Sequence, residues 1–199
     1  AQAECATAYP DITLTRTLAV SSRYVLDVVT AESATSHTYD LAWHIQGEPR
    51  PDFETRPAET PGKSAGFQHL TDVSMARTDQ SWSVDYRLGK SGGTRMTMMD
   101  APQTQVYLAS GLLGNPPNPC PVALARRSGN ATRYITLIEP YETTSAIKQI
   151  EVSDVTISGQ KYIRVTLSSP GGKEIVDLRS PENPSGTLFS YQSKAAGGK

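Results

Sequence analysis

The fold is decided by the stretch Ser81-Trp82-Ser83-Val84-Asp85-Tyr86-Arg87-Leu88, in which polar and apolar side chains alternate without a break. Successive side chains of an extended strand point to opposite faces, so this pattern predicts a half-buried antiparallel strand. The same period of two governs the stretch from Ile12 to Val20, where most even positions are apolar and most odd positions are threonine. No window of about 11 residues keeps the 3.6-residue period of an amphipathic helix. The chain is therefore predicted to be all-β.

Further strands follow on both sides of this stretch. Residues 24–30 and 134–138 are nearly continuous in β-branched and aromatic side chains, which is typical of central strands covered on both faces. Strands at 151–157, 161–167 and 173–178 are separated by glycine-containing turns and are predicted to form a meander. In total, about a dozen strands at this spacing favour an antiparallel β-sandwich of the jelly-roll kind.

The chain has 199 residues, a length that suits one domain, and we expect a single β-sandwich over residues 1–199. Residues 89–93 are rich in glycine and are predicted to close a hairpin. The polar stretch from Glu48 to Ser64 is expected to be the one long loop. The meander region is expected to occupy residues 151–192, and the tail at 193–199 is expected to fray.

Charge and hydropathy exclude several classes of partner. The 19 Lys and Arg residues nearly balance the 20 Asp and Glu residues, so the chain has no general field for nucleic acid or for an anionic membrane. No apolar run approaches the roughly 18 residues that a membrane span needs. The first residues lack the pattern of a signal peptide, so we expect any such signal to have been removed.

The two cysteines, Cys5 and Cys120, are far apart in sequence and neither belongs to a CxxC pair, which argues against structural zinc. One disulfide or two buried thiols remain open, and the disulfide is favoured because Cys120 lies in the proline-rich stretch 115–121. A disulfide would indicate an oxidising compartment, so the expected location is secreted, extracellular or periplasmic. The spacing of His37, Asp40 and His44 would alternate faces on a strand, so no metal site is predicted.

The segment from His37 to Gly47 combines imidazole, phenol, carboxylate and indole side chains, a mixture that suits a sugar. On a strand, Trp43 would point to one face while His44 and Gln46 point to the other. In one interpretation the segment forms a ligand-binding face that carries His37, Tyr39 or His44. The alternative places Trp43 in the core and lets His44 form a hydrogen bond across the sheet, for example to Asp27.

Adjacent arginines at positions 126 and 127 must also point to opposite faces of a strand. A solvated edge would explain both, and the sharper alternative is a guanidinium fork for a uronate carboxylate. The resulting candidates for contact with a carbohydrate are Tyr39, Trp43, His44, Gln46 and Arg126.

Several of these residues also carry a family resemblance. Tyr9-Pro10-Asp11, Tyr24-Val25-Leu26-Asp27 and His37-Thr38-Tyr39-Asp40 resemble the β-sandwich region of heparinase II/III-like polysaccharide lyases, particularly the alginate and oligoalginate lyases. Gly66-Phe67-Gln68-His69-Leu70 and Tyr134-Ile135-Thr136-Leu137-Ile138 follow in the family's order, and the likeness covers about residues 9–150. The resemblance implies the C-terminal sandwich portion of such a lyase, or a free-standing relative of it.

The family's catalytic machinery lies outside the matched stretch. An α/α toroid supplies its catalytic tyrosine and that residue's Asn or His partner, and an early His-x-His segment supplies a metal site. None of those positions exists in this sequence. No cofactor is therefore expected.

Three functions remain as hypotheses. The first is a non-catalytic module that binds or positions an acidic polysaccharide or oligosaccharide. The second is a small lyase acting by β-elimination, in which His37, Tyr39 and Arg126 supply base, acid and carboxylate neutralisation. The third is a structural domain that docks on a catalytic toroid.

Overall fold

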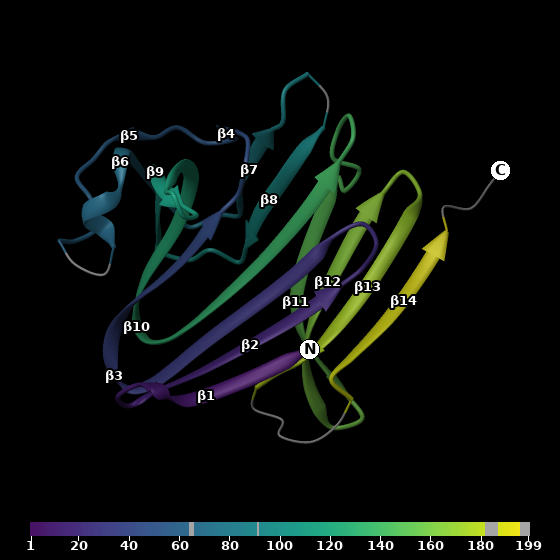
Figure 1. The fold of residues 1–199 in the computed structure, drawn as a ribbon. Helices are drawn as coiled ribbons and strands as arrows, with labels where there is room; N and C mark the ends of the chain where they lie inside the picture. Colours follow the sequence, from purple (N-terminus) through teal and green to yellow (C-terminus); the bar gives the residue numbers. More distant parts are fainter. Residues whose placement is uncertain (64–65, 91, 182–186, 196–199) are drawn as a thin grey trace.

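Two long antiparallel strands organise the structure, β3 (Val25–His44) and β10 (Asn118–Tyr141), which pair along almost their whole length. A computed structural model describes residues 1–63, 66–90, 92–181 and 187–195. Within those residues every regular element is a strand apart from one short 3-10 helix, so the predicted all-β antiparallel class is confirmed (Figure 1). The other elements are β1 (Gln2–Tyr9), β2 (Ile12–Val20), β4 (Glu48–Pro51), β5 (Arg56–Pro57), η1 (Phe67–His69), β6 (Thr71–Thr78), β7 (Trp82–Arg87), β8 (Gly93–Met99), β9 (Thr104–Leu113), β11 (Gln149–Ile157), β12 (Gln160–Ser169), β13 (Gly172–Arg179) and β14 (Phe189–Ala195).

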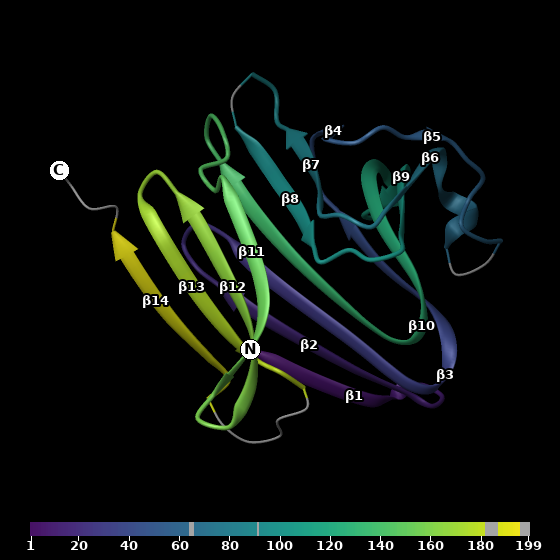
Figure 2. The ribbon, with the colours of Figure 1, turned by 180° about the vertical axis from the view of Figure 1, so that it is seen from behind.

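The strands form a ten-stranded sheet and a four-stranded sheet. The larger sheet branches at β10, because the two halves of that strand have different neighbours. The first half of β10 lies between β3 and β9, and its second half lies between β3 and β8. A register shift between Gly129 and Ala131 separates the halves. The branches let the large sheet curl over itself, while β11 to β14 lie against its other face (Figures 1 and 2).

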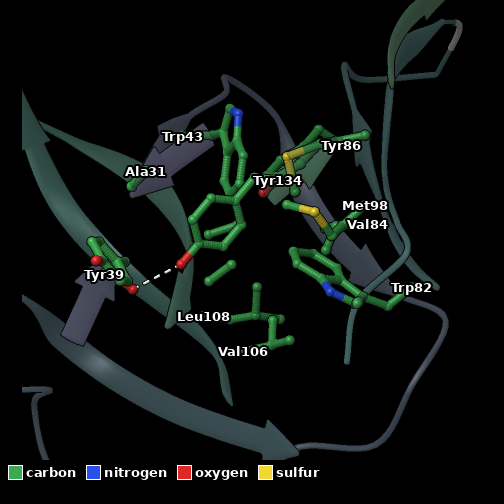
Figure 3. Close-up of a cluster of buried hydrophobic side chains, with 14 residues drawn as sticks. Ala31, Tyr39, Trp43, Trp82, Val84, Tyr86, Met98, Val106, Leu108 and Tyr134 are labelled. Atoms are coloured by element: carbon green, nitrogen blue, oxygen red, sulfur yellow. Dashed lines mark hydrogen bonds between the residues drawn. The ribbon is translucent and has the colours of Figure 1, made fainter. Parts of the chain in front are cut away.

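This arrangement creates two hydrophobic cores. The inner core is built from the large sheet alone and contains Trp43, Trp82, Tyr86, Met98 and Tyr134 (Figure 3). The inter-sheet core joins Leu26, Ile135 and Leu137 of the large sheet to Ile163, Val165 and Leu178 of the small one. Because β3 and β10 contribute to both cores, their apolar runs are covered on both faces, as the sequence predicted.

The predicted elements compare closely with the observed ones. The alternating stretch from Ser81 to Leu88 forms β7, with Trp82, Val84 and Tyr86 buried. The meander is confirmed as β11, β12 and β13, and the hairpin at residues 89–93 joins β7 to β8, although Ser91 lies outside the described residues.

Two expectations about loops are wrong in part. The stretch from Glu48 is not one loop, because β4 and β5 form within it and pair with β7 and β6. The tail does not fray at residue 193, because Ser193–Ala195 continue β14 and pair with β13. Residues 64–65 of the first stretch and 196–199 of the tail lie outside the described residues.

The expected disulfide between Cys5 and Cys120 is not formed, and both are free cysteines. Cys5 is exposed on β1 and pairs with Leu14 of β2, whereas Cys120 is buried on the first half of β10 opposite Gly111 of β9. The two residues therefore belong to different branches of the large sheet. Burial raises the pKa of the Cys120 thiol. As free thiols, Cys5 and Cys120 give no indication of an oxidising compartment.

No helix in the described part of the chain has the length and apolarity that crossing a bilayer requires.

Candidate functional site

The second half of β3 carries most of the predicted sugar contacts, and two of them point inward. Trp43 is only 6% exposed and Tyr39 is also buried, both in the inner core. The Tyr134 hydroxyl donates a hydrogen bond of 2.8 Å to the Tyr39 carbonyl (Figure 3). The Tyr39 hydroxyl donates one to the carbonyl of Asn130. Neither ring presents a face to solvent, so the structure matches the interpretation that Trp43 fills the core.

The residues at even positions of this segment point outward, as strand alternation requires. His44 is exposed beside Val122 of β10, and Gln46 donates a hydrogen bond to the Cys120 sulfur at 3.7 Å. The expected contact between His44 and Asp27 is wrong. Asp27 accepts both hydrogen bonds of the Arg16 guanidinium fork, at 2.9 and 2.7 Å, and lies toward the other end of β3.

Arg126 is fully engaged within the protein. Its Nε and one terminal nitrogen donate to the two Asp40 carboxylate oxygens, each at 2.7 Å, and its other terminal nitrogen donates to the Pro61 carbonyl at 2.7 Å. The guanidinium carbon lies 5.6 Å from the Phe67 ring centroid and 5.9 Å from that of Tyr107. The hydrogen bonds to Asp40 raise the Arg126 pKa. Its fork is therefore occupied, and Arg126 fastens the segment containing Pro61 and Phe67 to the sheet.

We expect Asp40→Ala to lower the free energy of unfolding by about 1 to 3 kcal/mol, because it removes two charge-assisted hydrogen bonds from a half-buried pair. Urea denaturation followed by circular dichroism measures this loss. Glu59→Ala is the matched control, since it removes the same charge from an exposed position with no ion pair within the described residues. Equal effects of the two substitutions would show that the pair does not stabilise the fold.

The three residues considered for β-elimination do not converge. Tyr39 lies directly opposite Arg127 in the β3–β10 pairing, so Arg126 projects from the other face of β10. His37 and Tyr39 do lie together, with ring centroids 6.1 Å apart. Burial, with the negative charge of Asp11 as a second cause, raises the Tyr39 pKa. A phenol with a raised pKa gives up its proton less readily, so Tyr39 is poorly suited to be the acid for the leaving oxygen.

His37 belongs to a polar cluster on the surface. Its Nε2 lies 3.0 Å from the Thr35 hydroxyl, 3.1 Å from that of Ser33 and 3.4 Å from a carboxylate oxygen of Asp11. The same Asp11 oxygen accepts both hydroxyls. One ring nitrogen therefore makes all of these contacts, which satisfies the polar groups of the turn but does not form a relay.

Sequence reasoning weighed Arg127 together with Arg126 but kept only Arg126 as a sugar contact; in the structure Arg127 is 6% exposed. Its three hydrogen-bond acceptors are neutral: the Thr104 hydroxyl at 2.8 Å, the Arg133 carbonyl at 2.5 Å and the Asp100 carbonyl at 3.1 Å. Its guanidinium carbon lies 4.6 Å from the Tyr134 ring centroid. Burial lowers the Arg127 pKa, and no carboxylate in the described residues pairs with its charge.

Arg127 contributes to the walls of two adjoining cavities. The first, of about 420 Å³, lies beside Glu32 and Asp100, and its second arginine, Arg133, is already paired with Asp100 and Asp154 at 2.9 and 2.6 Å. Glu32 and Asp100 thus place negative charge beside the arginines of this cavity. The second cavity has about 390 Å³ and is called the arginine cleft here; its walls include Arg77, Gln103, Gln105, Arg126, Arg127 and Ser128.

Strand register explains why the arginine cleft holds several arginines. Arg77 of β6, Gln105 of β9 and Arg126 of β10 are directly opposite one another and share a face. β9 begins at Thr104, and its last pair with β10 joins Gln105 to Arg126. Arg127 therefore lies where β10 is no longer paired with β9, and it can line the arginine cleft as well. Arg77 is exposed and makes no ion pair within the described residues. The carboxylate of Asp79, also at the cleft, accepts a hydrogen bond of 2.7 Å from the Gln103 backbone.

The connection between β8 and β9 forms one wall of the cleft and is strained. Asp100 and Gln103 have φ values of 49° and 48°, a region that residues other than glycine seldom occupy. Arg127 holds the Asp100 carbonyl and Asp79 holds the Gln103 amide. This wall is therefore fixed before any ligand arrives. With Arg126 neutralised by Asp40, Arg77 and Arg127 supply positive charge to the cleft. Arg77 is exposed, and each terminal nitrogen of Arg127 keeps one N–H beyond its bonds within the protein, which a carboxylate or sulfate group can accept.

Taken together, the fold and the cleft define a two-sheet antiparallel β-protein with a cationic cleft at a sheet edge. No protein-family model matches the chain, and no curated protein matches it in sequence. Among solved structures, it is similar to heparan sulfate lyase HepC from Pedobacter heparinus, with a TM-score of 0.58 and 14% identity. That match covers 87% of this chain and 25% of HepC, and a HepC mutant gives the same TM-score and identity over 86% and 24%.

The likeness shows that the fold is shared, and it partly bears out the resemblance drawn from the sequence. This chain spans about a quarter of the length of HepC. The neighbour is a lyase of heparan sulfate, not of alginate.

Proposed function

We propose that the chain is a non-catalytic module that binds an acidic polysaccharide or oligosaccharide in the arginine cleft. The observation that carries the proposal is the pair of cations, Arg77 and Arg127, that line the cleft and form no ion pair with a carboxylate among the described residues. Gln103, Gln105 and Ser128 add amide and hydroxyl groups of the kind that pair with sugar hydroxyls. A sandwich fold shared with a heparan sulfate lyase is consistent with an acidic glycan.

The stand-alone lyase is less well supported. Its proposed carboxylate-binding residue, Arg126, is bound to Asp40, and Tyr39 is buried with its pKa raised by that burial. Docking on a catalytic toroid remains the other candidate, since HepC is about four times longer than the part matched here. A secreted location would suit a module for extracellular polysaccharides, and it belongs to the same proposal.

We expect the purified chain to bind heparan sulfate, and Arg77→Ala to weaken binding about 3- to 10-fold through loss of one charge-assisted contact. Affinity electrophoresis or calorimetry at two salt concentrations measures this loss, which should shrink as salt screens the contact. Lys173→Ala is the matched control, because it removes one exposed positive charge from β13 of the small sheet.

Three results would contradict the proposal in different ways. Equal weakening by Arg77→Ala and Lys173→Ala would remove the cleft as the site. An increase in ultraviolet absorbance from unsaturated product, lost in His37→Ala or Tyr39→Phe, would establish a lyase. No binding and no product with heparan sulfate, alginate or polyglucuronate would leave docking on another domain as the function.

A further inference from the structure

A second concave surface lies on the same outer face of the large sheet. It is a groove of about 280 Å³, called the histidine groove here, and its walls include His44, Phe67, His69, Leu112, Val122 and Leu124. Two of the three histidines of the chain, 25 positions apart in sequence, thus line one surface. Sequence reasoning selected His44 but gave no role to Phe67, His69 or Leu112.

The chemistry of the groove is apolar with two polar groups at its rim. Buried Val122 and Leu124 form part of its floor, and exposed Leu112 forms part of its wall. No carboxylate lines it among the described residues. The His44 imidazole has no hydrogen-bond partner in the described part of the chain, so both of its ring nitrogens are available to a ligand.

The aromatic wall of the groove is held rigidly. The Arg126 guanidinium lies over the Phe67 ring, and Gly62 packs so closely that an added Cβ would come within 3.1 Å of that ring. Because Arg126 is itself bonded to Asp40 and Pro61, Phe67 is fixed relative to β3 and β10. An apolar ring that is fixed in advance favours stacking on a flat partner, since little side-chain freedom is lost on binding.

Arg126 connects the groove to the arginine cleft, because it lines the cleft and its guanidinium lies over Phe67 of the groove. His44 is four residues along β3 from Asp40, the partner of Arg126, a separation of about 13 Å on an extended strand. A ligand that reaches both surfaces must therefore be longer than one sugar ring.

We propose that the histidine groove is a second saccharide subsite. It takes a pyranose ring of the glycan chain whose acidic group lies in the arginine cleft, and so it rests on the proposed function. The apolar face of the ring lies on Phe67 and Leu112, while His44 and His69 exchange hydrogen bonds with its hydroxyls. The contact between Arg126 and Phe67, together with the lack of carboxylates among the described residues of the groove, favours an anionic oligosaccharide as the occupant over a basic peptide.

The three histidines allow a direct test by NMR. Heparan sulfate hexasaccharide is titrated into the full chain while the imidazole signals are followed. The signals of His44 and His69 are expected to shift on binding, whereas that of His37, in the cluster around Asp11, stays in place and serves as the internal control.

Affinity measurements separate the contribution of the histidine groove from that of the arginine cleft. The double variant H44A/H69A is expected to bind the hexasaccharide about 3- to 10-fold more weakly and the disaccharide unchanged, because the disaccharide needs only the cleft. Both residues are exposed, and unchanged thermal unfolding verifies the fold. Binding that depends on Arg77 but leaves both imidazole signals unmoved would overturn the subsite and spare the proposed function. Failure of the unmodified chain to bind either oligosaccharide would overturn both.

Discussion

Trp43→Ala is expected to lower the free energy of unfolding by about 3 to 5 kcal/mol, the usual cost of truncating a buried tryptophan. The indole lies in the inner core beside Tyr134 and close to Tyr86, both fully buried, so the protein cannot collapse into the space that the substitution leaves (Figure 3). The indole nitrogen has no hydrogen-bond partner within the described residues. The loss is therefore one of packing, not of hydrogen bonding.

Urea denaturation followed by far-ultraviolet circular dichroism measures this effect. The neighbouring substitution His44→Ala is the matched control, because it alters an exposed side chain on the opposite face of the same strand and is expected to change stability by less than about 0.5 kcal/mol. Similar losses from the two substitutions would contradict the burial of Trp43. Under conditions where Trp43→Ala remains folded, glycan binding should persist, since the indole is not in the arginine cleft.

Much of the fold could be predicted because the period of two is local. The alternation around Trp82, Val84 and Tyr86 specifies which side chains of β7 enter a core, whatever that strand pairs with. The turns of the C-terminal meander likewise lie between neighbouring strands. In contrast, the paired segments β4 and β5 contain prolines and too few residues for any period to be visible.

The candidate site could be predicted only in part, because alternation tells that Trp43 and His44 face opposite ways but not which of them faces the core. That choice depends on the curl of the large sheet. The row of Arg77, Gln105 and Arg126 depends on pairing among β6, β9 and β10, and no local signal in the sequence specifies that register. The same holds for His44 and His69. His44 lies on β3, and His69 reaches the same groove at the end of the segment that Arg126 fastens to the sheet.

Arg127→Lys is expected to weaken heparan sulfate binding about tenfold, which corresponds to about 1.4 kcal/mol. The lysine keeps a positive charge but loses the planar fork, so it can neither span the Thr104 hydroxyl and the Asp100 carbonyl nor present a second edge to a carboxylate or sulfate. Loss of the stacking on Tyr134 adds to the effect. Because those acceptors are buried and would lose their partner, we also expect stability to fall by about 1 to 3 kcal/mol.

The neighbouring arginine provides the comparison that separates binding from folding. Arg126→Lys removes the fork bound to Asp40 and should cost stability to a similar degree, but its charge is already neutralised by Asp40, so glycan affinity should change less than in Arg127→Lys. Calorimetric titration at one salt concentration measures the glycan affinity of both variants, and urea denaturation measures their free energies of unfolding. If Arg126→Lys instead lost more affinity than Arg127→Lys, the anion would lie on the Asp40 side of the sheet, and the assignment of Arg127 to the ligand would be wrong.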